Sequence, residues 1–82
     1  MKVKRKFTYE GVELRVVERE EPYMNAKEPL LMTRVLAPNN KHLPITIHRR
    51  QTIKSIIEES LRFLDEMKQK GHDVVKELTE ED

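Results

Sequence analysis

An amphipathic stripe near the C-terminus is the feature that most limits how this chain can fold. Over residues 52–70 the apolar side chains recur at helical spacing, so that they share one face of an α-helix. They are Ile53, Ile56, Ile57, Leu61, Leu64 and Met67. Thr52 precedes the stripe as a candidate N-cap, and Gly71 follows it where a helix-ending glycine belongs. The rest of the chain must cover the apolar face of a helix ~28 Å long.

The N-terminal part of the chain alternates between apolar and polar residues, which is typical of β-strands. Alternation over residues 2–9 and again over 12–19 predicts two strands joined as a hairpin. We expect a glycine bulge at the connection, because Glu10 fits poorly in a tight two-residue turn while Gly11 takes a positive φ without strain.

Two more strands are predicted before the helix. Residues 30–37 are apolar on both sides of the alternation, which favours a strand more buried than its neighbours. Residues 43–47 alternate again, and Pro44 restricts this fourth strand to the edge of the sheet. The sequence therefore predicts an α+β fold: a four-stranded antiparallel sheet, in the order β-β-β-β-α, with one long C-terminal helix packed on one face.

The length of 82 residues predicts a single α+β domain. We place this domain at residues 1–72 and expect residues 73–82 to form an acidic C-terminal tail that is partly frayed. Four strands make a sheet ~19 Å wide, whereas one helix covers only ~10 Å. A second copy of the chain is the simplest cover for the remainder, so we expect a homodimer.

Composition excludes several classes of protein. The chain has no cysteine, so disulfides and thiolate metal sites are ruled out, and a reducing cytoplasm is the expected location. The charged N-terminus has no apolar segment behind it, which argues against a signal peptide. No stretch approaches the ~20 apolar residues of a membrane span.

The charge is distributed unevenly along the chain. Residues 1–54 carry twelve Lys and Arg against six Asp and Glu, a net of +6, while residues 55–82 carry four against nine, a net of −5. The alternation gathers the cations of the first part on the sheet face opposite the core, and two arginines follow just before the helix. The candidate nucleic-acid-binding residues are Lys2, Lys4, Lys6, Arg15, Arg34, His48, Arg49 and Arg50. The simpler interpretation is a solvated surface.

Catalytic and metal chemistry find little support. His42 and His48 share a side of the predicted fourth strand, but six residues of strand span ~20 Å, and metal ligation needs each nitrogen within ~2.1 Å of the ion. Ser55 and Ser60 have no histidine at helical spacing to act as a base. We therefore expect no enzyme, no cofactor and no metal.

Two binding hypotheses remain. The first is a nucleic-acid-binding module that contacts the phosphates of DNA or RNA through the basic sheet face, with little base readout because the aromatic residues face inward. The alternative is a protein-interaction module, such as a small regulator or inhibitor of a larger protein. It would dock through the loop of residues 20–29, with Tyr23 and Met24 as its contacts. Under this alternative, a phage or a mobile element is one source that fits the small size and charged composition.

Overall fold

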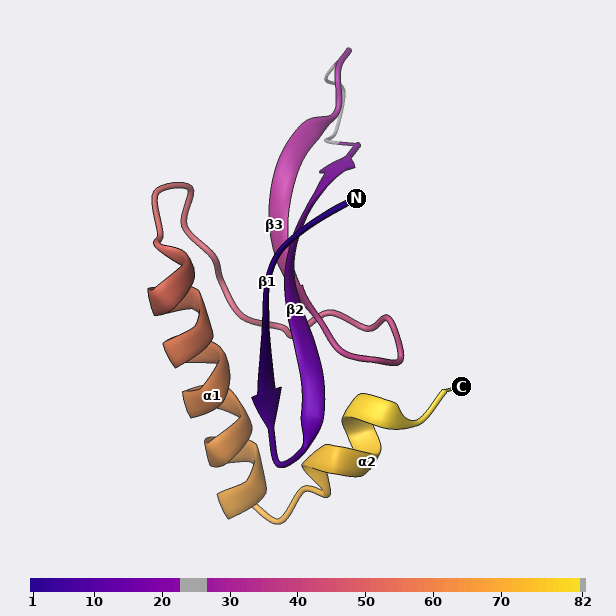
Figure 1. Cartoon of the computed structure of the whole chain (residues 1–82), viewed down its shortest axis with the longest axis vertical. Coiled ribbons are helices and arrows are strands. Elements are labelled where there is room, and N and C mark those ends of the chain that lie inside the picture. The colour runs from indigo at the N-terminus through magenta and orange to yellow at the C-terminus, as the bar shows by residue number, and fades with distance from the viewer. Residues whose placement is uncertain (23–26, 82) are drawn as a thin grey trace.

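The chain folds into a three-stranded sheet followed by two helices (Figure 1). This computed structural model describes residues 1–22 and 27–81. The strands form one antiparallel sheet in the order β1-β2-β3. The elements are β1 (Lys2–Tyr9), β2 (Val12–Glu21), β3 (Leu30–Leu36), α1 (Ile53–Gln69) and α2 (Val74–Thr79). The class is α+β, as the sequence predicts.

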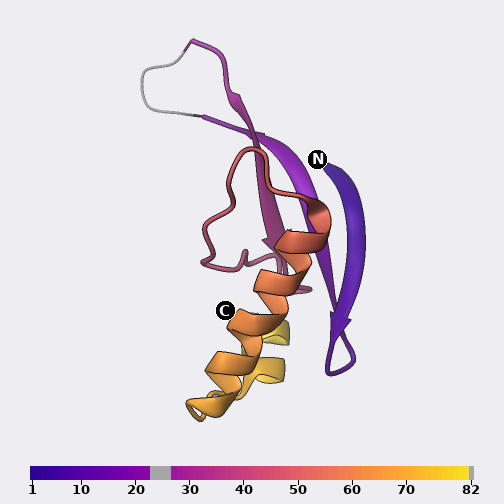
Figure 2. The ribbon, with the colours of Figure 1, turned by 90° about the vertical axis from the view of Figure 1, so that its left-hand side faces the viewer.

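Both helices lie at the hairpin end of the sheet. Figures 1 and 2 show α1 and α2 beside the β1–β2 turn, while the opposite end of β2 and β3 projects beyond the first turn of α1. The helices and the sheet share one core, to which α1 contributes Ile56 and Leu64, α2 contributes Val74 and Leu78, and the sheet contributes side chains from all three strands. The projecting end of the sheet is therefore left without helical cover.

The helix predicted over residues 52–70 is present as α1, with the predicted cap. The hydroxyl of Thr52 accepts the backbone N–H of Ser55 at 3.1 Å, and Gly71 takes a φ of 93° after the last turn. The most buried residues of α1 are Ile56, Ser60 and Leu64, whereas Leu61 is only half-buried. Leu64, rather than Leu61, is therefore the large apolar residue at the centre of the contact.

The predicted four-stranded sheet with one helix is wrong, because residues 43–47 do not form a strand. His42 makes a single bridge opposite Leu36, and the N–H of Leu43 donates to the carbonyl of Val35 at 2.9 Å. The carbonyl of Leu43 then accepts the N–H of Ile45 at 2.9 Å in a turn around Pro44. The turn therefore occupies the Leu43 carbonyl, which would accept the next hydrogen bond from β3 if the strand continued. Pro44 also has no N–H to donate, so pairing with β3 ends after one bridge.

The β1–β2 connection also differs from the expectation. Glu10 and Gly11 both have positive φ values, 47° and 80°, between the paired residues Tyr9 and Val12. This is a two-residue turn and not a glycine bulge. Glu10, whose positive φ is unfavourable for a residue other than glycine, forms an ion pair with Lys68 of α1. This hydrogen-bonded ion pair raises the pKa of the Lys68 ammonium.

The sheet has a β-bulge near the start of β1. The register shifts between Val3 and Arg5, so that Lys4 is the extra residue of a β-bulge. Three strands make a sheet ~14 Å wide, and α2 adds cover beside α1. The width argument for a second copy therefore loses its premise, and the homodimer stays a prediction.

Tyr9 of β1 is hydrogen-bonded to α1, and its phenol group is titratable. Its hydroxyl donates to Oδ1 of Asp65 at 2.9 Å, and burial, followed by this hydrogen bond, raises its pKa from 10.0 to about 12. The neutral phenol is therefore favoured in the folded state. The corresponding stabilisation should be complete below pH 10 and should disappear as the pH rises toward 12.

An ultraviolet titration of the phenolate can measure this shift directly. Tyr9 and Tyr23 are the two tyrosines of the chain, so Tyr23→Phe isolates the Tyr9 signal. We expect Asp65→Asn in that background to move the Tyr9 pKa part of the way back toward 10.0, because the negative neighbour is removed. An unchanged pKa in the Asp65→Asn protein would show that the hydrogen bond is not formed in solution.

A second prediction concerns the centre of the helix–sheet contact. Leu64 is 1% exposed, so Leu64→Ala should lower the free energy of unfolding by ~2–5 kcal/mol through lost burial and a residual cavity. Glu66 is exposed on the same helix, and Glu66→Ala should change it by less than ~0.5 kcal/mol. Urea denaturation followed by circular dichroism measures both, and equal effects would mean that α1 presents a different face to the sheet.

Candidate interaction site

The outer edge of β3 is open along its first half. β2 pairs with one side of β3 over the whole strand, whereas the other side meets only the bridge to His42 and the bond from Leu43, among the residues that the structure describes. Leu30 and Leu31, at the start of this edge, are 43% and 64% exposed. Open strand edges readily accept another strand, so this edge is the first candidate for a binding site.

A groove lies beside the open edge. It has a volume of about 330 Å³ and is lined by residues 30–34 of β3 and by Ile47, His48 and Arg49. The second wall comes from the segment between β3 and α1, which leaves the sheet at the Pro44 turn. The groove therefore combines exposed backbone, aliphatic side chains and cationic side chains in one place.

The cationic wall is built by a turn that leads into α1. The N–H of Gln51 donates to the carbonyl of His48 at 3.0 Å, and the Gln51 side-chain oxygen accepts the N–H of His48, also at 3.0 Å. Arg49 and Arg50 are the two central residues of this turn and are exposed. Thr52 then caps the helix, so α1 holds the position of the turn.

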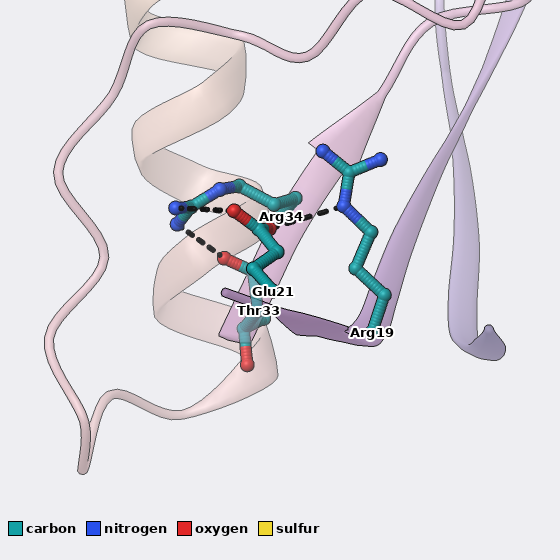
Figure 3. Close-up of polar contacts among 4 residues, drawn as sticks. All are labelled: Arg19, Glu21, Thr33 and Arg34. Atoms are coloured by element: carbon teal, nitrogen blue, oxygen red, sulfur yellow. Dashed lines mark hydrogen bonds and ion pairs between the residues drawn. The ribbon is translucent and has the colours of Figure 1, made fainter. Parts of the chain in front are cut away.

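Arg34 lines the groove, and Figure 3 shows its side chain in polar contact with Glu21 and Thr33. Its guanidinium donates to the carbonyl of Thr33 at 3.2 Å and to Oε1 of Glu21 at 3.3 Å. The other oxygen of Glu21 accepts Nε of Arg19 at 3.0 Å. The hydrogen bond from Arg19 is the largest of the causes that lower the pKa of the Glu21 carboxyl, which keeps it ionised between the two arginines.

The predicted basic sheet face is largely compensated by acids on neighbouring positions. Lys4 pairs with Glu18 at 3.1 Å, and Lys6 pairs with Glu13 at 3.6 Å. Arg34 pairs with Glu21, as described above. These three cations are therefore less available to a phosphate than the alternation in the sequence suggests.

The bulge at Lys4 also separates residues that the sequence placed on one face. Lys6 lies opposite Arg15, on the outer face of the sheet, while Lys2 lies opposite Glu18, on the same side as the core residue Val16. A one-residue shift moves every later side chain to the other face. Lys2 and Lys6 therefore lie on opposite faces, and Val17 is fully buried on the outer one.

The remaining candidates fall into two places. Arg15 is half-buried on the outer face, whereas Arg34, His48 and Arg49 meet at the groove. Tyr23 and Met24, the predicted contacts of the alternative, lie outside the described residues.

The exposure of Leu30 and Leu31 was not predicted from the sequence. Residues 30–37 are apolar at positions that face both sides of the sheet, and this pattern predicted a buried strand. The available signal was Pro44, since a proline near the start of the next strand limits how much of the β3 edge that strand can cover.

Other sites carry less chemistry. A smaller hollow of about 180 Å³ lies between α1, α2 and residues 37–44, and its lining is mostly apolar. The buried Ser60 hydroxyl donates to the carbonyl of Ile56 at 2.8 Å, so its hydrogen-bonding partner lies within α1. Within residues 1–22 and 27–81, no group of three or more His, Asp or Glu side chains could hold a metal ion. In the same ranges, no helix has the length and apolar character needed to cross a membrane.

Comparison with known proteins identifies no relative. No protein-family model, no curated protein and no solved structure matches this chain.

Proposed function

We propose that this chain is a small, non-enzymatic module that binds another protein through the open edge of β3 and the groove beside it. The observation that carries this proposal is the exposure of Leu30 and Leu31, 43% and 64%, on the first half of a strand edge that pairs with no other strand among the described residues. Most strand edges in proteins are shielded from such contacts. This apolar edge projects beyond both helices, so helical cover does not block a partner from it.

The groove supports the same proposal. Its aliphatic residues can bury partner side chains, while Arg34, His48 and Arg49 can orient polar groups. The site lies directly after residues 27–29, which are exposed and lead into β3. The proposal therefore keeps the protein-interaction hypothesis but moves its centre from the 20–29 loop to β3. Within it, the module acts as a small regulator or inhibitor in a reducing cytoplasm.

Affinity purification from a nuclease-treated lysate of the source organism tests this proposal. Leu31→Ser removes an exposed apolar side chain from the groove, and Val75→Ser removes one from α2, where Val75 is 36% exposed. Burying a leucine at an interface contributes ~1.5–3 kcal/mol, so Leu31→Ser should reduce partner recovery about tenfold or more. Val75→Ser should leave the recovery unchanged.

Quantitative mass spectrometry of the retained proteins gives the readout, and thermal unfolding of each variant confirms that the fold is intact. A partner that both variants retain as well as the original chain would contradict the proposed surface. So would a partner that both variants lose equally.

Nucleic-acid binding is a second candidate function, now centred on the turn before α1. Arg49, Arg50 and Lys54 make no ion pair with the described residues, and the first turn of α1 contains no acidic residue. Cations beside a helix N-terminus attract phosphate. The compensated sheet face contributes less than the sequence suggested.

Fluorescence anisotropy with a labelled oligonucleotide of about 20 residues, in single- and double-stranded form, tests this candidate. Two phosphate contacts to a single strand give a salt slope of about −1.4 between about 50 and 200 mM salt. Replacing Arg49 and Arg50 by Ala should remove these two contacts and their contribution to the salt slope, and the loss should be the same for all nucleic-acid sequences. Lys4→Ala with Lys6→Ala is the matched control and should change little. A larger loss from the lysine pair would return the site to the sheet face.

A further inference from the structure

We infer that the partner segment recognised at this site is an extended, acidic stretch of chain that adds to the outer edge of β3 as a fourth strand. The inference rests on the proposed function and names the chemistry of its partner. Three features of the site carry it: the free backbone groups of β3, the wall that faces them, and the charge of the groove.

The backbone groups follow from the existing bond on this edge. The carbonyl of Val35 points outward, because it accepts the N–H of Leu43. In an antiparallel sheet every second residue presents its N–H and carbonyl to the same side, so Leu31 and Thr33 also present theirs outward. The Thr33 carbonyl accepts Arg34. The N–H and carbonyl of Leu31 and the N–H of Thr33 then remain to receive an added strand.

The far wall of the groove limits what can enter. An added strand lies ~4.8 Å from β3, and beyond it stand Ile47, His48 and Arg49. We place a single extended segment between β3 and this wall. The β3 edge of a second copy would bring its own β2 and its own 47–49 segment with it, and these would meet the wall. The groove therefore favours a partner's segment over self-pairing.

The charge of the groove selects the composition of that segment. Among the described residues, its lining includes Arg34, His48 and Arg49 and no acidic residue. Glu21 balances Arg34, whereas Arg49 makes no ion pair with any described residue. Side chains of a strand alternate between its two sides. A segment that alternates aliphatic and acidic residues can therefore place the former against Leu31 and Ile47 and the latter near Arg49.

Three synthetic peptides of about eight residues test each part of the inference. The first alternates Glu and Val, the second alternates Lys and Val, and the third is the Glu–Val peptide with alternate backbone nitrogens methylated. We expect the first to bind saturably, with amide shift changes confined to residues 30–34 and 47–49. The other two should bind at least about tenfold more weakly, because each lacks one required property.

Two variants of the chain provide matched controls. Arg49 lines the groove and its neighbour Arg50 does not. Arg49→Glu should weaken the Glu–Val peptide about tenfold or more, while Arg50→Glu, with the same charge change, should alter it less than about threefold. Thr33→Pro removes an outward N–H without touching the bonds to β2, so it should abolish peptide binding in a protein that still unfolds cooperatively.

Each result supports or overturns the inference. Equal binding of the methylated peptide excludes strand addition, and equal weakening by the Arg49 and Arg50 variants means that the turn acts as a general anion site. Shift changes outside the groove, or no binding of the Glu–Val peptide, also overturn it. Leu31→Ser can abolish recovery of a lysate partner while the Glu–Val peptide fails to bind the original chain. In that case the proposed protein-binding function is supported, and only the inference of an acidic added strand is overturned.

Discussion

A single three-residue turn decides what kind of surface this protein presents. The hydrogen bond from Ile45 to the carbonyl of Leu43 closes a turn around Pro44 and diverts the chain from the sheet after one bridge. Without that turn, residues 43–47 could pair with β3 and cover its edge. With it, the chain crosses to the His48–Gln51 turn and the cap of α1, and a groove is left between the two. The open edge, the cationic wall and the exposed leucines all depend on this one diversion.

The charges of the sheet are organised around local compensation. Lys4, Lys6 and Arg34 each face an acid on a neighbouring position or strand. Exposed pairs of this kind contribute little to stability, but they make these three cations locally less available to an anion, while the net charge of +6 over residues 1–54, which already counts these acids, is unchanged. Arg49, Arg50 and Lys54, which make no ion pair with the described residues, lie at the start of α1, where the helix dipole adds to their attraction for an anion. Charge therefore points to the same region as the groove.

Local signals explain how much of this fold the sequence predicts. The limits of α1 follow from an apolar stripe and from caps within a few residues of it, and the hairpin follows from alternation on either side of Glu10 and Gly11. The bulge at Lys4 has no such signal, because the partner strand determines which residue is extra. Since a one-residue shift exchanges the faces, the predicted grouping of Lys2 with Lys6 could not be tested from the sequence. The exposure of Leu31 likewise depends on the path of a segment twelve or more residues away.

The guanidinium of Arg34 gives the open edge a further property. It occupies the Thr33 carbonyl and stands beside the groups that an added strand would use. In a fibril, identical strands stack in register ~4.8 Å apart, so each Arg34 would lie directly above another. Repulsion between the stacked guanidinium groups opposes amyloid growth, whereas a single added strand forms no such column. The edge can therefore stay open to a partner while resisting endless stacking with copies of itself.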